Sequence, residues 1–288
     1  FTAPIYPATG RTLAHWFPAR QRASANGAIP AAAVVGNAGT FIGFGTLMDW
    51  FGWPVAFAIT GTITGMLAVL WIWYGRNWPK EHAGVNDAEL QWIEATPSPR
   101  DPPAAKPGQW RTLLRNRSLL LLTICYAAIG YFEYLFYFWM RSYFDDELKV
   151  TKDASRLYAT LLMLAMAGGM LLGGWLSDRL ARVRGRRVAR TIVVVSGMLS
   201  GAALLGVGLV AQNVGTIVTC FALTVAAVGA TEGPAWATAI ELGGKQGATA
   251  AGIYITVGNL GGLLAPVVTP FVSELLDPKW GIGLGGLV

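Results

Sequence analysis

Arg11, Glu133 and Glu232 are charged residues within long apolar stretches of the sequence. A charge at the centre of a membrane helix costs about 2.5–3.5 kcal/mol on insertion scales, so such residues mark the paths of ions or substrates. The guanidinium of Arg11 can hold a carboxylate through two hydrogen bonds. A glutamate buried away from water can take up and release a proton. The expected chemistry is anion binding and proton movement. The sequence shows no nucleophile with a base near it, so we do not expect an enzyme.

Arg11 has two possible roles. It lies seven residues before Pro18, which is about 10 Å along a helix at 1.5 Å per residue. From that depth it either contributes positive charge to an anion pathway or extends its side chain to the cytoplasmic membrane surface.

The face of the helix around Glu133 is also ambiguous. At about 100° per residue, Glu133 shares a face with Tyr126 and Tyr137, whereas Tyr131 and Tyr134 lie nearly opposite. The cost of burying a carboxylate favours the Glu133 face as the functional one, with Glu133 as a candidate for coupling to an ion. One regular helix cannot turn both faces to a substrate.

A proline predicts a break in the apolar segment that contains Glu232, in the run Thr231-Glu232-Gly233-Pro234-Ala235-Trp236. Pro234 cannot bond the carbonyl four residues earlier, and broken membrane helices of this kind line cavities. Glu232 is therefore a second coupling candidate.

The stretch 173–187 combines glycines, an acid and arginines between two apolar segments. It contains Gly174, then Asp178-Arg179, then Gly185-Arg186-Arg187, and six arginines fall between positions 178 and 190. Carboxylates and guanidinium groups form charge-assisted bonds that can hold helix ends together in one state and release them in another. We expect Asp178 to bond a neighbouring helix end or an arginine of its own loop. A loop that only keeps its charge on the cytoplasmic side would explain the arginines but not the glycines.

The composition indicates an integral membrane protein. Hydrophobic residues make up 53% of the chain and charged residues 13%, against about 25% charged in soluble domains. The net charge of +6 comes mainly from loops between apolar segments, so it reports topology and not nucleic-acid binding. Cys125 and Cys220 lie in apolar segments, where we expect buried free thiols and neither a metal site nor a cofactor.

Eight apolar segments are predicted to cross the membrane and must position these residues. The first, at residues 1–17, is expected to be the lower part of a truncated span. The others are residues 25–48, 54–74, 118–143, 154–177, 191–211, 214–240 and 248–275. The basic loops 18–24, 76–117, 178–190 and 241–247 are assigned to the cytoplasmic side of a multi-pass protein of the inner membrane. Within the loop 76–117, Asn86 and Glu89 predict the start of a short helix.

An internal repeat predicts two similar halves. Val35-Gly-Asn-Ala-Gly39 recurs as Val257-Gly-Asn-Leu-Gly261, six spans later and in the same direction, which is typical of a transporter built from parallel repeats of six helices. The chain then holds spans four to eleven of twelve and the start of the last, and both ends look like cuts. Residues 1–75 form three spans of the first bundle, 76–117 a cytoplasmic connector, and 118–288 the second bundle.

The stretch from Gly174 to Arg187 resembles the loop signature of the major facilitator superfamily. Further motifs resemble the anion:cation symporter family, namely Arg11…Trp16-Phe17-Pro18, Gly52-Trp53 and Gly258-Asn259-x-Gly261-Gly262. The resemblance implies an all-α transporter, expected to be a monomer in the bilayer, that imports a small organic anion such as a sugar acid together with H+ or Na+. It also implies Arg11, Tyr131, Tyr134, Trp236 and Asn259 as substrate contacts, although Asn259 could instead bond a neighbouring helix. Two alternatives are a transporter-like ligand sensor and an efflux antiporter of the same fold.

We expect Arg11→Lys and Arg11→Ala to weaken anion binding strongly in the intact protein, because lysine keeps the charge but loses the planar fork. Binding titrations with a sugar acid measure the effect. Normal affinity in both variants would reduce Arg11 to an anchor at the membrane surface.

Overall fold

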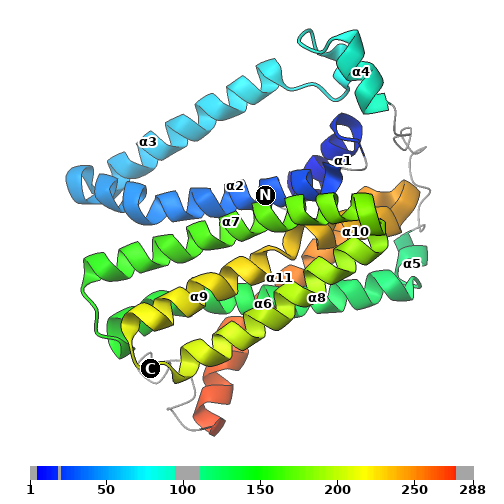
Figure 1. Ribbon diagram of the computed structural model, residues 1–288. Helices are drawn as coiled ribbons and strands as arrows, with labels where there is room; N and C mark the ends of the chain where they lie inside the picture. Colours follow the sequence, from blue (N-terminus) through cyan, green and yellow to red (C-terminus); the bar gives the residue numbers. More distant parts are fainter. Residues whose placement is uncertain (1–4, 19–20, 95–109, 277–288) are drawn as a thin grey trace.

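The computed structural model describes residues 5–18, 21–94 and 110–276, and the regular elements in these ranges are all helices (Figure 1). They are α1 (Ile5–Trp16), α2 (Arg22–Gly39), α3 (Gly45–Tyr74), α4 (Asp87–Glu94), α5 (Trp110–Leu113), α6 (Arg117–Ser142), α7 (Lys152–Arg184), α8 (Arg186–Val210), α9 (Val214–Gly229), α10 (Glu232–Gly243) and α11 (Gly247–Leu276). Short single-turn helices lie at Thr40–Phe44, Pro79–Glu81, Tyr143–Glu147 and Gly244–Gln246. The chain is an all-α membrane protein, as its apolar segments predict.

Six spans in the described ranges are long and apolar enough to cross a membrane, so the prediction of eight is too high by this criterion. They correspond to α3, α6, α7, α8, α9 joined with α10, and α11. The difference lies in α1 and α2. The 12 residues of α1 make about 18 Å of helix, short of a hydrocarbon core of about 30 Å. α2 is rich in alanine and glycine and contains two asparagines, so its mean hydropathy stays below that of the six spans.

α2 packs lengthwise against α7, and small residues make this contact close. A Cβ atom on Gly27 of α2 would lie 2.6 Å from the carbonyl oxygen of Met170 in α7. In the other direction, a Cβ on Gly174 would lie 2.7 Å from the carbonyl oxygen of Ala23. Larger side chains at these positions would push the two backbones apart. Figure 1 shows α2 between α3 and α7.

α9 and α10 are two parts of one broken span, as Pro234 predicts. α9 ends at Gly229 and α10 begins at Glu232. Between them the N–H of Thr231 donates to the carbonyl of Val228 at 2.9 Å, which tightens the turn. The break leaves Glu232 in the first turn of α10, in the interior of the helix assembly.

α6 and α11 approach so closely that backbone meets backbone. A Cβ on Gly130 of α6 would overlap the carbonyl oxygen of Gly258 in α11, and a Cβ on Gly261 would overlap that of Ala127. The ring of Tyr126 lies directly over Gly258. This contact fixes Tyr126 between α6 and α11. Cys125 therefore points away from the packed face and is exposed, so its expected burial is wrong, whereas Cys220 is buried.

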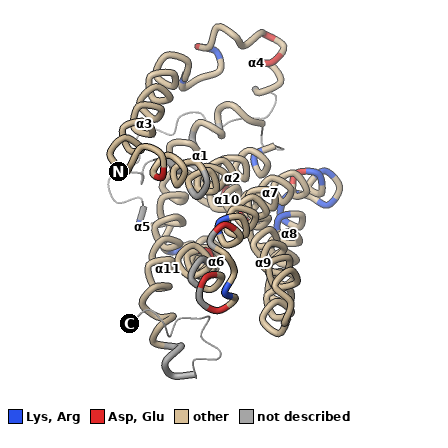
Figure 2. The backbone as a smooth tube through the Cα atoms, turned by 90° about the vertical axis from the view of Figure 1, so that its left-hand side faces the viewer, with Lys and Arg blue, Asp and Glu red and all other residues tan. Residues whose placement is uncertain are grey.

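The basic loops gather at one end of the helices. The indole N–H of Trp16, at the end of α1, donates to the carbonyl of Arg76 after α3 at 3.2 Å. The ring of His15 stacks on Trp78 with centroids 4.2 Å apart. Figure 2 shows lysines and arginines clustered around the junction of α7 and α8. The chain is a multi-pass membrane protein whose basic end is cytoplasmic by the positive-inside rule.

α3 turns back at Gly52 and is then almost fully exposed. Gly52 has φ 74°, a conformation that favours glycine, and it lies between the predicted spans 25–48 and 54–74. Ala56 is the one buried residue among those described in α3. α1 and α2 pack on helices of residues 118–288, and α3 meets α7 at an ion pair of 3.9 Å between Asp49 and Arg156. The division into 1–75, 76–117 and 118–288 stays a prediction.

The connector contains the short helix that its sequence predicts. α4 begins at Asp87, and the side-chain oxygen of Asn86 accepts a hydrogen bond from the N–H of Glu89 at 2.8 Å. This is the expected N-cap.

We expect Gly169→Ala to destabilise the contact between α7 and α9, because a Cβ at this position would overlap the backbone of Ala226. Overpacking of this kind costs about 1–3 kcal/mol, which should lower the melting temperature in detergent. Gly168→Ala is the matched control, since a Cβ there meets no atom within 4 Å. Equal melting temperatures for the two variants would contradict the close packing of α7 on α9.

Candidate functional site

Side chains from three helices converge on the buried carboxyl group of Glu232. Its Oε2 accepts hydrogen bonds from Nε1 of Trp236 at 3.0 Å, one turn along α10, and from the hydroxyl of Tyr126 in α6 at 3.3 Å. The rings of Tyr126 and Tyr254 of α11 stack with centroids 3.9 Å apart. Trp236 meets the ring of Tyr254 nearly at a right angle, with centroids 5.2 Å apart. We call Tyr126, Glu133, Glu232, Trp236 and Tyr254 the carboxyl cluster.

Glu133 is the second acid of the carboxyl cluster. It follows Tyr126 by about two turns of α6, as the helical period predicts, and lies within range of the charge of Glu232. Oε1 of Glu133, Oε1 of Glu232 and the hydroxyl of Tyr254 are buried without a hydrogen-bond partner. The described residues hold no group of three or more His, Cys, Asp or Glu side chains that could bind a metal ion. The unpaired oxygen atoms of the carboxyl cluster can therefore bind a proton or a small polar group.

Trp236 connects the carboxyl cluster with the first helices of the chain. Its side chain is 4% exposed and lines a cavity of about 10 Å³, room for about one water molecule, together with Thr9 and Gly10 of α1 and Asn26 and Pro30 of α2. An organic anion would reach Trp236 here only if α1 and α2 moved apart from α10, because the cavity as it stands is too small for one.

Two of the predicted substrate contacts on α6 are used within the helix assembly. The hydroxyl of Tyr131 shares a hydrogen bond of 2.7 Å with Oγ1 of Thr269 in α11. The ring of Tyr134 packs over Gly262 of α11. The structure thus turns both tyrosines toward α11 and does not bring them together with Trp236.

The remaining predicted contacts lie elsewhere. Asn259 is exposed on α11. Arg11 follows Gly10 in α1, but its side chain lies outside the described residues. The substrate roles of these residues stay predictions.

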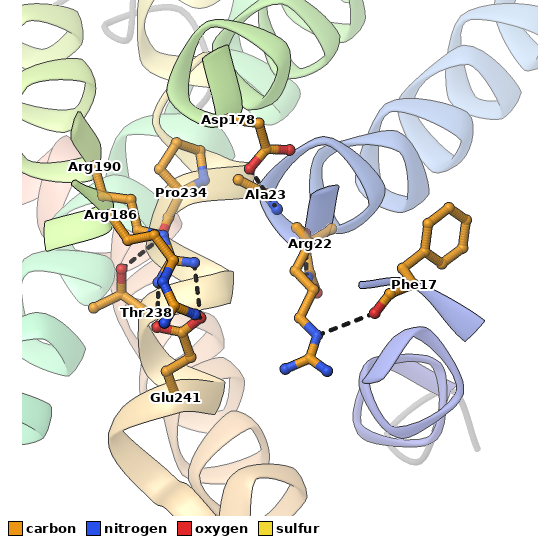
Figure 3. Close-up of polar contacts among 10 residues, drawn as sticks. Phe17, Arg22, Ala23, Asp178, Arg186, Arg190, Pro234, Thr238 and Glu241 are labelled. Carbon is orange, nitrogen blue, oxygen red and sulfur yellow. Dashed lines mark hydrogen bonds and ion pairs between the residues drawn. The ribbon is translucent and has the colours of Figure 1, made fainter. Parts of the chain in front are cut away.

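A second group of charged residues lies at the basic end of α7 and α8, and Figure 3 shows its contacts. Asp178 of α7 reaches the N-terminus of α2, where its carboxylate accepts hydrogen bonds from the N–H of Ala23 at 3.3 Å and from the N–H of Ser24 at 2.7 Å. The Ser24 hydroxyl donates a third bond of 2.6 Å. α2 has no side-chain cap of its own, and negative charge is favourable at a helix N-terminus. The predicted bond of Asp178 to a neighbouring helix end is confirmed.

Arg190 and Glu241 form a bidentate ion pair that the sequence reasoning missed (Figure 3). The two guanidinium nitrogens of Arg190 in α8 donate to the carboxylate of Glu241 in α10 at 2.8 and 2.9 Å, and Arg186 adds a contact of 3.3 Å. The charge of Glu241 also acts on Arg22 of α2. We call Arg22, Asp178, Arg186, Arg190 and Glu241 the cytoplasmic charge cluster. Both partners stand at predicted span ends, but 51 residues separate them and no local pattern joins them.

The other residues of the loop signature have separate roles. Gly185 joins α7 to α8 with φ 79°, which explains the glycine. The guanidinium of Arg179 lies 5.5 Å from the centroid of the exposed Trp175 ring. Arg187 is exposed.

The fold is that of a multi-pass helical membrane protein. Its helices α1 and α2 pack on helices of residues 118–288, close to the two clusters of charged residues. The family model described as Major Facilitator Superfamily matches residues 1–266. The chain belongs to this superfamily.

Several curated relatives are named for sugar-acid transport. The chain is 28% identical over 285 residues to the probable galactarate/D-glucarate transporter of Bacillus subtilis, covering 94% of this chain and 61% of the relative. It is 25% identical over 276 residues to the hexuronate transporter of the same organism, with coverages of 94% and 63%. It is 25% identical over 289 residues to the D-galactonate transporter of Escherichia coli, with coverages of 95% and 65%. The chain thus spans less than two thirds of the length of these relatives.

We expect Asp178→Asn in the intact protein to lower turnover about tenfold or more, because hydrogen bonds to a charged group contribute about 1.5–3 kcal/mol. Ligand affinity should change much less, since Asp178 lies away from the carboxyl cluster. Turnover and equilibrium binding of a sugar acid are measured on the same preparations, with the exposed Arg187→Ala as the control. Unchanged turnover in Asp178→Asn would show that this bond does not hold the helix ends together in one transport state and release them in another.

Proposed function

We propose that the intact protein is a secondary active transporter that imports a small organic anion, with sugar acids as the substrate class, by alternating access and together with a cation. The observation that carries this proposal is the buried carboxyl cluster, which Trp236 links to the cavity between α1, α2 and α10. Membership of the superfamily and similarity to relatives named for sugar acids support the substrate class. The bacterial inner membrane is the proposed location.

The proposed anion site lies between the first helices and α10. Trp236 offers it an indole edge from α10, and Arg11 of α1 would supply the positive charge that a carboxylate requires. Tyr131, Tyr134 and Asn259 would join the site only after α6 and α11 change their position relative to α1 and α2.

The coupling ion is proposed to act at Glu133 and Glu232. Both are acids inside membrane-length helices, and both have a buried oxygen free of hydrogen bonds to the described residues. A charge that must be neutralised before the helices can move past one another is a means of coupling an ion to transport.

The cytoplasmic charge cluster is proposed to close the inner end of the pathway. Asp178 of α7 bonds the first turn of α2, so opening between these helices must break three hydrogen bonds to one carboxylate. Closure on this side and access from the other would then alternate.

Uptake into proteoliposomes containing the intact protein tests this function. We expect labelled D-galactonate, D-glucarate or a hexuronate to accumulate under an inward proton or sodium gradient and to leave when the gradient is dissipated. D-galactose is the matched control, because it lacks the carboxylate. Specific binding without uptake would indicate a ligand sensor, and outward transport driven by an inward proton gradient would indicate an efflux antiporter; either result would overturn import.

A further inference from the structure

We propose that Glu133 and Glu232 form one proton-binding site, and that the Trp236 N–H links its occupancy to the cavity between α1, α2 and α10. The second part rests on the proposed function, because it assumes that an anion enters that cavity. The first part concerns the protein without any substrate.

The two carboxyl groups share one buried environment. Glu232 is 2% exposed, whereas Glu133 is half-buried as a residue, with its Oε1 buried. The charge of Glu232 acts on Glu133. No Lys, Arg or His side chain that the structure describes acts electrostatically on Glu133 or Glu232. Two ionised carboxylates in one desolvated site repel each other, and no described cation offsets this repulsion, so the pair is expected to hold a proton.

Hydrogen bonding favours Glu133 as the residue that carries this proton. Oε2 of Glu232 accepts from Trp236 and Tyr126, and both bonds stabilise a negative charge on Glu232. Glu133 has a buried Oε1 without a donor among the described residues. A proton from water that forms an O–H bond on Glu133 gives this group a donor, and its return to water restores the carboxylate.

The surroundings of the pair leave the proton as the simplest occupant. Tyr126 of α6 and Tyr254 of α11 are the neutral titratable groups facing it, and Cys125 lies near Tyr254. Arg11 of α1 has its side chain outside the described residues. On α8 and the far end of α10, Arg190 and Glu241 pair with each other, about 13 Å along α10 from Glu232.

Trp236 gives the site a means of sensing an anion. Its N–H stabilises the charge of Glu232, while its side chain also lines the cavity. A carboxylate that takes over this N–H removes a donor from Glu232 and adds a negative charge nearby. Both changes increase the affinity of the pair for protons, and by linkage protons increase the affinity for the anion, which is the sign that symport requires.

Thermal unfolding of the ligand-free intact protein in detergent, between about pH 5 and about pH 9, tests the proton site. If the folded state binds more protons than the unfolded state, stability falls as the pH rises. We expect Glu133→Gln and Glu232→Gln each to flatten this fall and to melt above the wild type at the alkaline end. Glu89→Gln, an exposed change on α4, is the matched control and should keep the wild-type slope.

A pH-independent difference between wild type and Glu133→Gln would overturn the proton site. If that difference depends on pH as expected while no sugar acid is taken up, the site stands and the transport proposal fails. The two proposals are thus tested separately.

Trp236→Phe tests the link, because it keeps an aromatic ring but removes the N–H. Without this donor the negative charge of Glu232 is less stable, so the fall in melting temperature should move to higher pH. In the wild type, the dissociation constant for D-galactonate should rise with pH by up to about tenfold per pH unit, as for one coupled proton. Trp236→Phe should flatten this rise, and an unaltered pH profile of both melting and binding would overturn the link.

Discussion

The contact between α2 and α7 depends on one requirement: the first backbone N–H groups of a helix must be paired when that helix end is buried. α2 has no cap of its own, and Asp178 of α7 supplies the acceptor for Ala23 and Ser24. Gly27 and Gly174 then let the two backbones lie together. α2 also packs on α10, and together with α1 it lines the small cavity beside Trp236. The inner closure and the candidate substrate site therefore share one set of helix contacts.

Charge is satisfied differently at the two clusters. At the cytoplasmic end, Arg190 and Glu241 neutralise each other in a bidentate pair, and the cost of burial is offset locally. In the interior, Glu133 and Glu232 have tyrosine and tryptophan neighbours but no described cation. The cytoplasmic cluster is suited to holding helices together. The interior cluster is suited to gaining and losing a proton, because that is the simplest way to remove its charge.

The features that could be predicted from the sequence depend on local chemistry. Pro234 cannot bond the carbonyl four residues earlier, Asn86 caps the turn that follows it, and an aspartate among arginines at a helix end finds a donor. The grouping of Glu133 with Tyr126 follows from the helical period. Each of these predictions uses only a few neighbouring residues, although the sequence did not name Ser24, 154 residues away, as a partner of Asp178.

Features that depend on packing between distant helices could not be predicted. The pair of Arg190 and Glu241 requires α8 to lie against α10. Tyr131 and Tyr134 face α11 because glycines of α11 allow α6 to pack closely against it. The sequence of α6 alone does not contain this information. The span count was too high by the hydropathy criterion because α2 consists largely of alanine and glycine, which suit close packing on α7 but add little hydropathy.

The distance between the cytoplasmic ends of α2 and α7 tests most directly whether Asp178 closes this side of the protein. Spin labels at Gln21 and Arg182, which line the cavity beside Asp178, report this distance in the intact protein by pulsed electron paramagnetic resonance. We predict a population at short distance in the wild type that shrinks in favour of longer distances in Asp178→Asn. Identical distance distributions in the two proteins would contradict closure by the Asp178 cap.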